Sequence, residues 1–136
     1  MAMHKEKAQA AVELVILLPV LLLFLLGSLD LGRAFSVWLT LANGSREGAR
    51  YGCLYPTDIA GITAQTKADI LADGLSDGVL RVQVSTPKRD INNLPVPGSP
   101  VVVTALYTLP MTTMYLFGGQ PLSIRASTQM MILGGS

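Results

Sequence analysis

One long apolar segment near the start of the chain constrains its fold more than any other feature. From Leu14 to Leu29 the sequence LVILLPVLLLFLLGSL contains no ionisable side chain. As an α-helix, this block together with residues 9–13 is long enough to cross the hydrocarbon core of a bilayer, which is about 30 Å thick. Its many leucine, isoleucine, valine and phenylalanine side chains make insertion favourable. The sequence therefore predicts one membrane-spanning helix.

Two residues are costly in such a helix. Glu13 places a carboxylate at the start of the apolar run, and Pro19 lies in its interior. A carboxylate in hydrocarbon loses its water, and a proline removes one helical hydrogen bond. Glu13 either reaches the headgroups without a partner or pairs with a positive charge. Pro19 either kinks a membrane helix or marks a place where the helix loosens.

The charges that flank the apolar run predict its orientation. His4, Lys5 and Lys7 precede it, with only Glu6 against them. The positive-inside rule therefore places the N-terminus in the cytoplasm and everything after Asp30 outside. A removable secretory signal is the alternative, but LLGSLDLGRAF offers no convincing small-x-small cleavage site, and the apolar run is longer than a usual signal core. The net charge of +1 gives no basic excess for binding nucleic acid.

The helical pattern continues beyond the apolar run, with no proline before Pro56. One helix of about 45 residues is therefore expected. Within it Gly44, Gly48 and Gly52 recur at every fourth position. Glycine in a helix costs about 1 kcal/mol relative to alanine, so this stripe predicts close packing against the rest of the chain or a neighbouring helix. The alternative is a frayed helix end, because Gly52 and Pro56 are common stop signals.

Residues 56–136 are expected to form a small head. Thr57 or Asp58 can cap a short helix that ends before Gly74. The runs at 79–86, 101–109 and 122–133 alternate or are continuously apolar, which predicts three antiparallel strands with the second more central. The outer half of the long helix, including its glycine stripe, should cover the apolar face of this sheet. The predicted fold class is α+β, with the long helix packed on the sheet and one short extra helix.

Four segments follow from this interpretation. They are a cytoplasmic leader (1–8), a transmembrane and assembly helix (9–30), an amphipathic continuation of that helix (31–55) and the α+β head (56–136). The lone cysteine, Cys53, either pairs between chains or is a small residue packed in the interior.

The N-terminal third also resembles a known family. The sequence KAQAAVELVILLPVLLLFLLGSLDLGRAFSVWLTLANGSREGARYG is similar to the N-terminal signature of TadE-like proteins, the pilin-like components of tight-adherence (Tad, Flp) pilus systems, and more broadly to that of type IV prepilins. The shared features are a basic leader, a small residue, a glutamate five places later, an apolar helix, and the motifs GRA and REGARYG.

The resemblance implies a pilin-like subunit that is used in adhesion. A prepilin peptidase would cut between Ala8 and Gln9, and Glu13 would become the fifth residue of the mature chain. Ala8 stands where these families have glycine. Pro19 would lie where many pilin helices loosen on assembly. The implied partners are copies of itself or other pilins, the peptidase, the Tad inner-membrane assembly platform, and membrane lipid before assembly; the final location would be an extracellular pilus.

The spacing between Gln9 and Glu13 suggests a physical role for the predicted new N-terminus. Gln9 and Glu13 are four residues apart, so they share one helical face about 6 Å apart along the axis. In a medium of low dielectric, the freed amine of one subunit could neutralise Glu13 of a neighbour. Glu13 would then set the register between subunits.

Enzymatic chemistry finds little support in the sequence. The only histidine, His4, lies in the leader, and the head has no phosphate-binding glycine loop, metal-ligand spacing or Ser/His/Asp set. We expect no enzyme activity, cofactor or metal. The alternatives to a pilin are a permanently anchored Tad assembly component and a membrane-tethered binding module, for which the KRDINN loop is a candidate by exposure alone.

Overall fold

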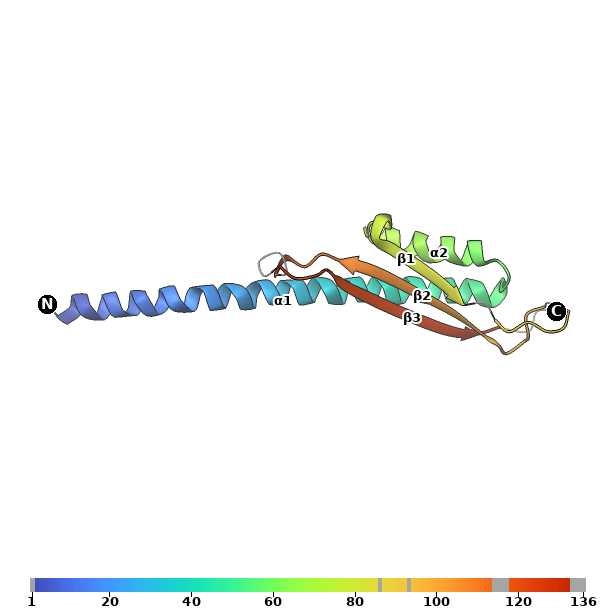
Figure 1. Cartoon of the computed structure of the whole chain (residues 1–136), viewed down its shortest axis with the longest axis horizontal. Helices are drawn as coiled ribbons and strands as arrows, with labels where there is room; N and C mark the ends of the chain where they lie inside the picture. The colour runs from blue at the N-terminus through green and yellow to red at the C-terminus, as the bar shows by residue number, and fades with distance from the viewer. Residues whose placement is uncertain (1, 86, 93, 114–117, 133–136) are drawn as a thin grey trace.

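The computed structural model describes residues 2–85, 87–92, 94–113 and 118–132, with side chains for Gln9 and from Ala11 onward. Within these residues, two α-helices, one short 3-10 helix and three strands follow one another. They are α1 (Ala2–Leu54), α2 (Ile59–Ala72), η1 (Asp77–Val79), β1 (Leu80–Ser85), β2 (Pro100–Leu109) and β3 (Leu122–Met131). Figure 1 shows a long rod, α1, with a small head along its C-terminal half. The α+β fold class is confirmed.

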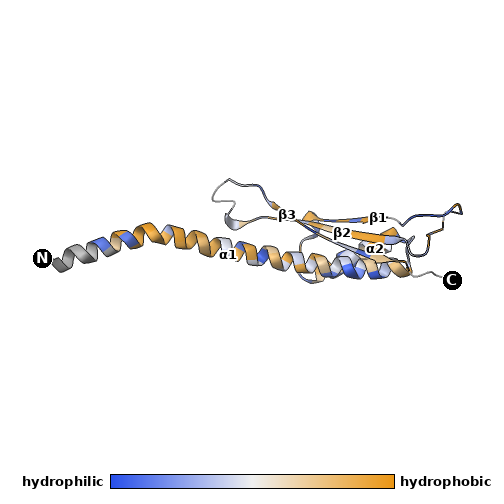
Figure 2. Ribbon diagram, turned by 90° about the horizontal axis from the view of Figure 1, so that it is seen from below, coloured by the Kyte–Doolittle hydropathy of each residue, from blue (hydrophilic) through white to orange (hydrophobic). Residues whose placement is uncertain are grey.

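Helix α1 is continuous over 53 residues and includes Pro19 in its interior. It is longer than the expected 45 residues because the helix begins at Ala2 and so includes residues 2–8, for which the sequence predicts a leader. In Figure 1 its N-terminal half extends beyond the head, and in Figure 2 this projecting half is the most hydrophobic part of the helix.

Helix α2 begins and ends at the residues that the capping signals indicate. The Asp58 side chain caps its start by accepting a hydrogen bond of 2.8 Å from the backbone N–H of Gly61. Gly74 follows its end with a φ of 85°, in the left-handed region that glycine adopts without steric cost. The predicted short helix is confirmed.

The three strands form one antiparallel sheet in the order β1-β2-β3. Strand β2 is central, as its apolar sequence predicts, and its odd-numbered residues are all buried. In register, Val82 lies opposite Ala105, which lies opposite Ala126. These positions face the helices, because side chains of one parity share one face of a strand.

The core lies between this face of the sheet and the two helices. Leu41 of α1 packs in one cluster with Ile70 of α2 and Tyr107 of β2, and Ala49 of α1 packs in a second with Ile62 and Val103. The sheet thus covers α1, as expected. The expectation that it also covers the whole glycine stripe is wrong: α2 covers most of that stripe, because only residues without side chains let two helices approach so closely.

Candidate assembly helix and its junction with the head

The projecting part of α1 forms a candidate assembly surface. Residues 11–29, which we call the bare half, carry large apolar side chains, and nearly all of them are exposed. Among the described residues, this region of α1 contains the one stretch that is long and apolar enough to cross a membrane, and none of that stretch is buried by the rest of the chain. The exposed large apolar residues are Val12, Leu14, Val15, Ile16, Leu17, Leu18, Val20, Leu21, Leu22, Leu23, Phe24, Leu25 and Leu29.

The residues predicted for processing and register lie at the beginning of this surface. Ala8, Gln9 and Glu13 are all within α1, and the side chains of Gln9 and Glu13 are exposed. They are one turn apart, on one helical face. Among the side chains that the structure describes, none makes a hydrogen bond or ion pair with Glu13. Its carboxylate is therefore available to a group from outside the described chain.

Pro19 lies exposed in the middle of the bare half, and α1 continues through it. Its missing N–H leaves the carbonyl of Val15 without the usual helical donor. The helix is thus weakest here in backbone hydrogen bonding, on a part of α1 that no head element covers.

The glycine stripe lies against α2 and β2. A Cβ added at Gly44 would lie 3.2 Å from the backbone oxygen of Thr66, and one at Gly48 would overlap the Thr66 hydroxyl. A Cβ at Gly52 would lie 3.0 Å from Val101 of β2. All three glycines are buried. The close approach is therefore made within this chain.

Two buried hydroxyls accompany this packing. The Ser45 hydroxyl donates a hydrogen bond to the carbonyl of Leu41, and the Thr66 hydroxyl donates one of 2.8 Å to the carbonyl of Ile62. Each hydroxyl is satisfied within its own helix, so the two helices can meet without an unpaired buried polar group.

Where the bare half meets the head, Asp30 is held by three donors. The backbone N–H and hydroxyl of Thr113 donate to its Oδ2 over 2.7 Å and 2.6 Å, and the N–H of Thr112 donates to its Oδ1 over 3.1 Å. Asp30 is only 3% exposed. These donors compensate the carboxylate for the water that it loses on burial.

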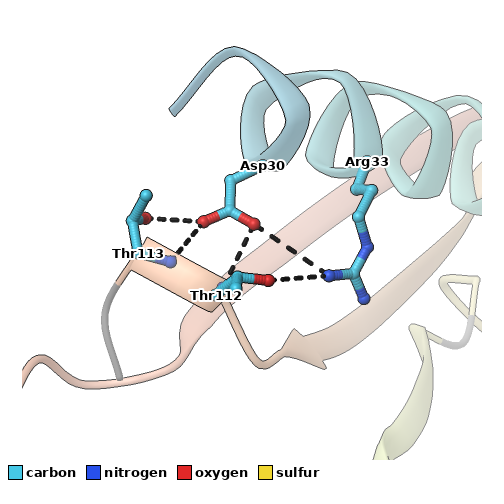
Figure 3. Close-up of polar contacts among 4 residues, drawn as sticks. All are labelled: Asp30, Arg33, Thr112 and Thr113. Atoms are coloured by element: carbon cyan, nitrogen blue, oxygen red, sulfur yellow. Dashed lines mark hydrogen bonds and ion pairs between the residues drawn. The ribbon is translucent and has the colours of Figure 1, made fainter. Parts of the chain in front are cut away.

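Arg33 completes this junction. Its Nη1 lies 4.0 Å from Asp30 Oδ1 and donates a hydrogen bond of 3.5 Å to the hydroxyl of Thr112. Figure 3 shows both charged side chains of α1 directed toward the segment that carries Thr112 and Thr113. Sequence reasoning missed this site and treated Asp30 as a boundary alone. The available signal was a single carboxylate at the end of a long apolar run, which requires a partner when buried.

Cys53 lies at the other end of α1, in the interior. It is free and buried, and desolvation raises the pKa of its thiol. A neutral thiol is a poor nucleophile, so this position favours a packed small residue over a reactive one. It borders an open hollow of about 370 Å³ that is lined mainly by apolar side chains, with Arg50 at its edge.

The charged residues near Cys53 form an ordinary surface pair. Glu47 accepts two hydrogen bonds from the guanidinium of Arg50, and these bonds lower the pKa of Glu47. Across the residues that the structure describes, no group of three His, Cys, Asp or Glu side chains gathers as metal ligands.

Comparison with known proteins identifies the region that contains these features. Residues 8–50 match the family described as TadE-like protein. The match begins at Ala8, covers the bare half, and includes Asp30, Arg33, Gly44 and Gly48 but not the Thr112 and Thr113 side of the junction. No curated protein and no solved structure matches the chain. A TadE-like region together with an apolar helix of this length fits a membrane protein associated with a Tad pilus.

Proposed function

We propose that this chain, whose N-terminal region is TadE-like, is a pilin-like structural subunit of a Tad pilus. It is made as a single-pass membrane precursor with its N-terminus in the cytoplasm and its head outside the cytoplasmic membrane. It then leaves the bilayer and assembles through the bare half of α1, so that the head becomes part of an extracellular filament that serves adhesion.

The observation that carries this proposal is the exposure of the bare half. A single large apolar side chain gains about 1.5–3 kcal/mol when it is fully buried. An exposed apolar surface that extends without interruption over residues 11–29 marks an interaction site. Because the head covers none of it, the partner comes from outside the chain: lipid in the precursor, and helices of other subunits in the filament.

Maturation by a prepilin peptidase supplies the second part of the proposal. Cleavage between Ala8 and Gln9 frees an amine one helical turn before Glu13. In the filament, Glu13 of an incoming subunit meets the amine of a neighbour, and each neutralises the other in a dry environment. A wrong axial offset leaves both charges unpaired, so the pair selects one register.

Mass spectrometry of the N-terminus tests the maturation. In cells that produce the pilus, we expect the chain to begin at Gln9, and we expect Ala8→Gly to increase the cleaved fraction because prepilins carry glycine there. A strain with an inactive prepilin peptidase is the control and should retain the leader. A chain with an intact leader in sheared filaments contradicts the proposed cleavage.

Substitution of Glu13 tests the assembly. Glu13→Leu removes the charge but keeps an apolar helix, so the variant should reach the membrane and be absent from sheared filaments, as judged by immunogold labelling. Glu47→Leu makes the same chemical change on residues 30–54, which we call the head half of α1, and should leave filament incorporation intact. Normal incorporation of Glu13→Leu contradicts the register role.

A permanently anchored Tad assembly component is the second candidate. The observation that favours it is that α1 begins at Ala2, so the leader continues the membrane helix without a break. A retained leader together with absence of the chain from sheared filaments would support this candidate over the pilin.

A further inference from the structure

An apolar stripe continues from the bare half onto the first turns of the head half. It consists of Leu31, Phe35, Trp38 and Leu39, which we call the aromatic stripe. Phe35 is 61% exposed and Trp38 43% exposed. Their rings stack with centroids 6.0 Å apart. The spacing of four, three and one residues places these side chains on one helical face.

The other side of the same turns is attached to the head. Asp30 precedes Phe35 by five residues, which is a rotation of about 140° around the helix axis. Its bonds to Thr112 and Thr113 (Figure 3) fix the rotation of α1 relative to the head and leave Phe35 on the side of the helix away from that contact. Trp38 lies about 80° from Asp30 around the axis and remains 43% exposed.

Helix length indicates the depth of the stripe in a membrane. If Glu13 lies at the cytoplasmic boundary of the hydrocarbon, about 20 helical residues cross the 30 Å core, and the outer boundary falls near Arg33. The Cα atoms of Phe35 and Trp38 then lie about 3 Å and about 8 Å beyond it. The polar layer is about 5–7 Å thick, and helical side chains lean toward the N-terminus, so both rings reach this layer.

We propose that the aromatic stripe anchors the membrane-inserted chain in the headgroup layer of the extracytoplasmic leaflet. Phe35 and Trp38 lie among phospholipid headgroups. This inference rests on the membrane insertion in the proposed function, and it requires neither cleavage nor filament assembly.

Residue chemistry favours lipid over a second copy as the occupant. Tryptophan is enriched at membrane–water interfaces because it has a large apolar ring and one polar N–H. Closely packed membrane helices instead meet at small residues, and the aromatic stripe has none. The hydrogen bonds that Thr112 and Thr113 donate to Asp30 agree with its place near the outer boundary of the hydrocarbon. A carboxylate there has lost part of its water and requires other donors.

The single tryptophan of the chain makes the depth measurable. The full chain is reconstituted into phosphatidylcholine–phosphatidylglycerol vesicles that carry bromine either near the headgroups or deep in the acyl chains. We expect the fluorescence of Trp38 to lose more intensity with the shallow label than with the deep one. Two double variants are controls. Trp38→Phe with Phe24→Trp, within the bare half, should respond most to the deep label; Trp38→Phe with Tyr55→Trp, directly after the end of α1, should respond to neither.

Vesicle flotation separates failure of the inference from failure of insertion. A chain that does not float with the vesicles overturns both this inference and the membrane step of the proposed function. A chain that floats while neither label quenches Trp38 leaves insertion intact and overturns the anchor. Quenching that appears only when the protein is diluted with excess lipid shows that a second copy covers the stripe, which also overturns the anchor.

Discussion

The two halves of α1 belong to one unbroken helix but are built on opposite principles. The bare half presents leucine, valine, isoleucine and phenylalanine on all sides, and these side chains are exposed. The head half carries Gly44, Gly48 and Gly52 on one side, and these glycines are buried against α2 and β2. Large apolar side chains therefore surround the helix where the chain offers no cover, and glycines lie where α2 and β2 approach it most closely.

This contrast shows where each half finds its partner. Burial of the head half is completed within the folded chain, by α2 and the sheet. Burial of the bare half requires lipid or other subunits. This division fits the proposed function, in which the head is complete by itself and the bare half exchanges lipid for neighbouring helices.

A leucine-to-alanine pair tests this contrast with the largest expected effect. Leu41 is fully buried in the head core, so Leu41→Ala should lower the free energy of unfolding of the head by about 2–5 kcal/mol. Leu21→Ala makes the same change on the bare half and should leave head stability unaltered. Hydrogen exchange of the β2 amides, on the full chain in detergent, measures both. An equal loss in the two variants would show that the head also depends on the bare half.

A glycine-to-alanine pair should have a smaller effect, of opposite sign in the two variants. A Cβ at Gly48 overlaps the Thr66 hydroxyl and lies 3.1 Å from its Cβ, so Gly48→Ala should destabilise the head by about 1–3 kcal/mol. Gly32 has open space around it, and Gly32→Ala should stabilise the helix by up to about 1 kcal/mol. The same exchange measurement reports both. If Gly48→Ala is also stabilising, α2 can move away without cost and the stripe is not a close contact.

The junction between the halves should give the smallest and most local effect. Asp30→Asn keeps the size of the side chain but replaces one acceptor oxygen by an NH2 donor, which then faces the N–H of either Thr112 or Thr113. Faster exchange of these two amides is expected, with little change in β2. Arg50→Gln, which removes only a surface ion pair, is the control and should leave both amides unchanged. Unchanged exchange in Asp30→Asn would show that other contacts hold the junction.

Much of the fold is predictable because its signals are local. Asp58 and Gly74 bound α2 through a cap and a left-handed residue that act within a few positions of the chain. Alternation along β1 and the continuous apolar run of β2 depend only on the period of a strand and on its place in the sheet. The apolar length of the bare half likewise depends on composition alone.

The misses involve contacts between segments that are distant in sequence. Thr112 and Thr113 follow Asp30 by more than 80 residues. No local sequence pattern in either segment predicts that the two segments are in contact. The glycine stripe indicated a close contact but could not identify α2 as the element that makes it. Both contacts depend on the position in which the sheet and α2 pack against α1 in the folded chain.

By itself, the sequence determined that this chain has a membrane-length apolar helix and a three-stranded antiparallel head, because periodicity, capping and hydropathy act over short stretches of the chain; its N-terminal motifs carry the resemblance to TadE-like proteins. Only the tertiary structure decided that α2 covers most of the glycine stripe, that Asp30 is held by the head, and that the aromatic stripe faces outward. These outcomes depend on the rotation of α1 relative to the head, which is fixed by long-range contacts and close packing.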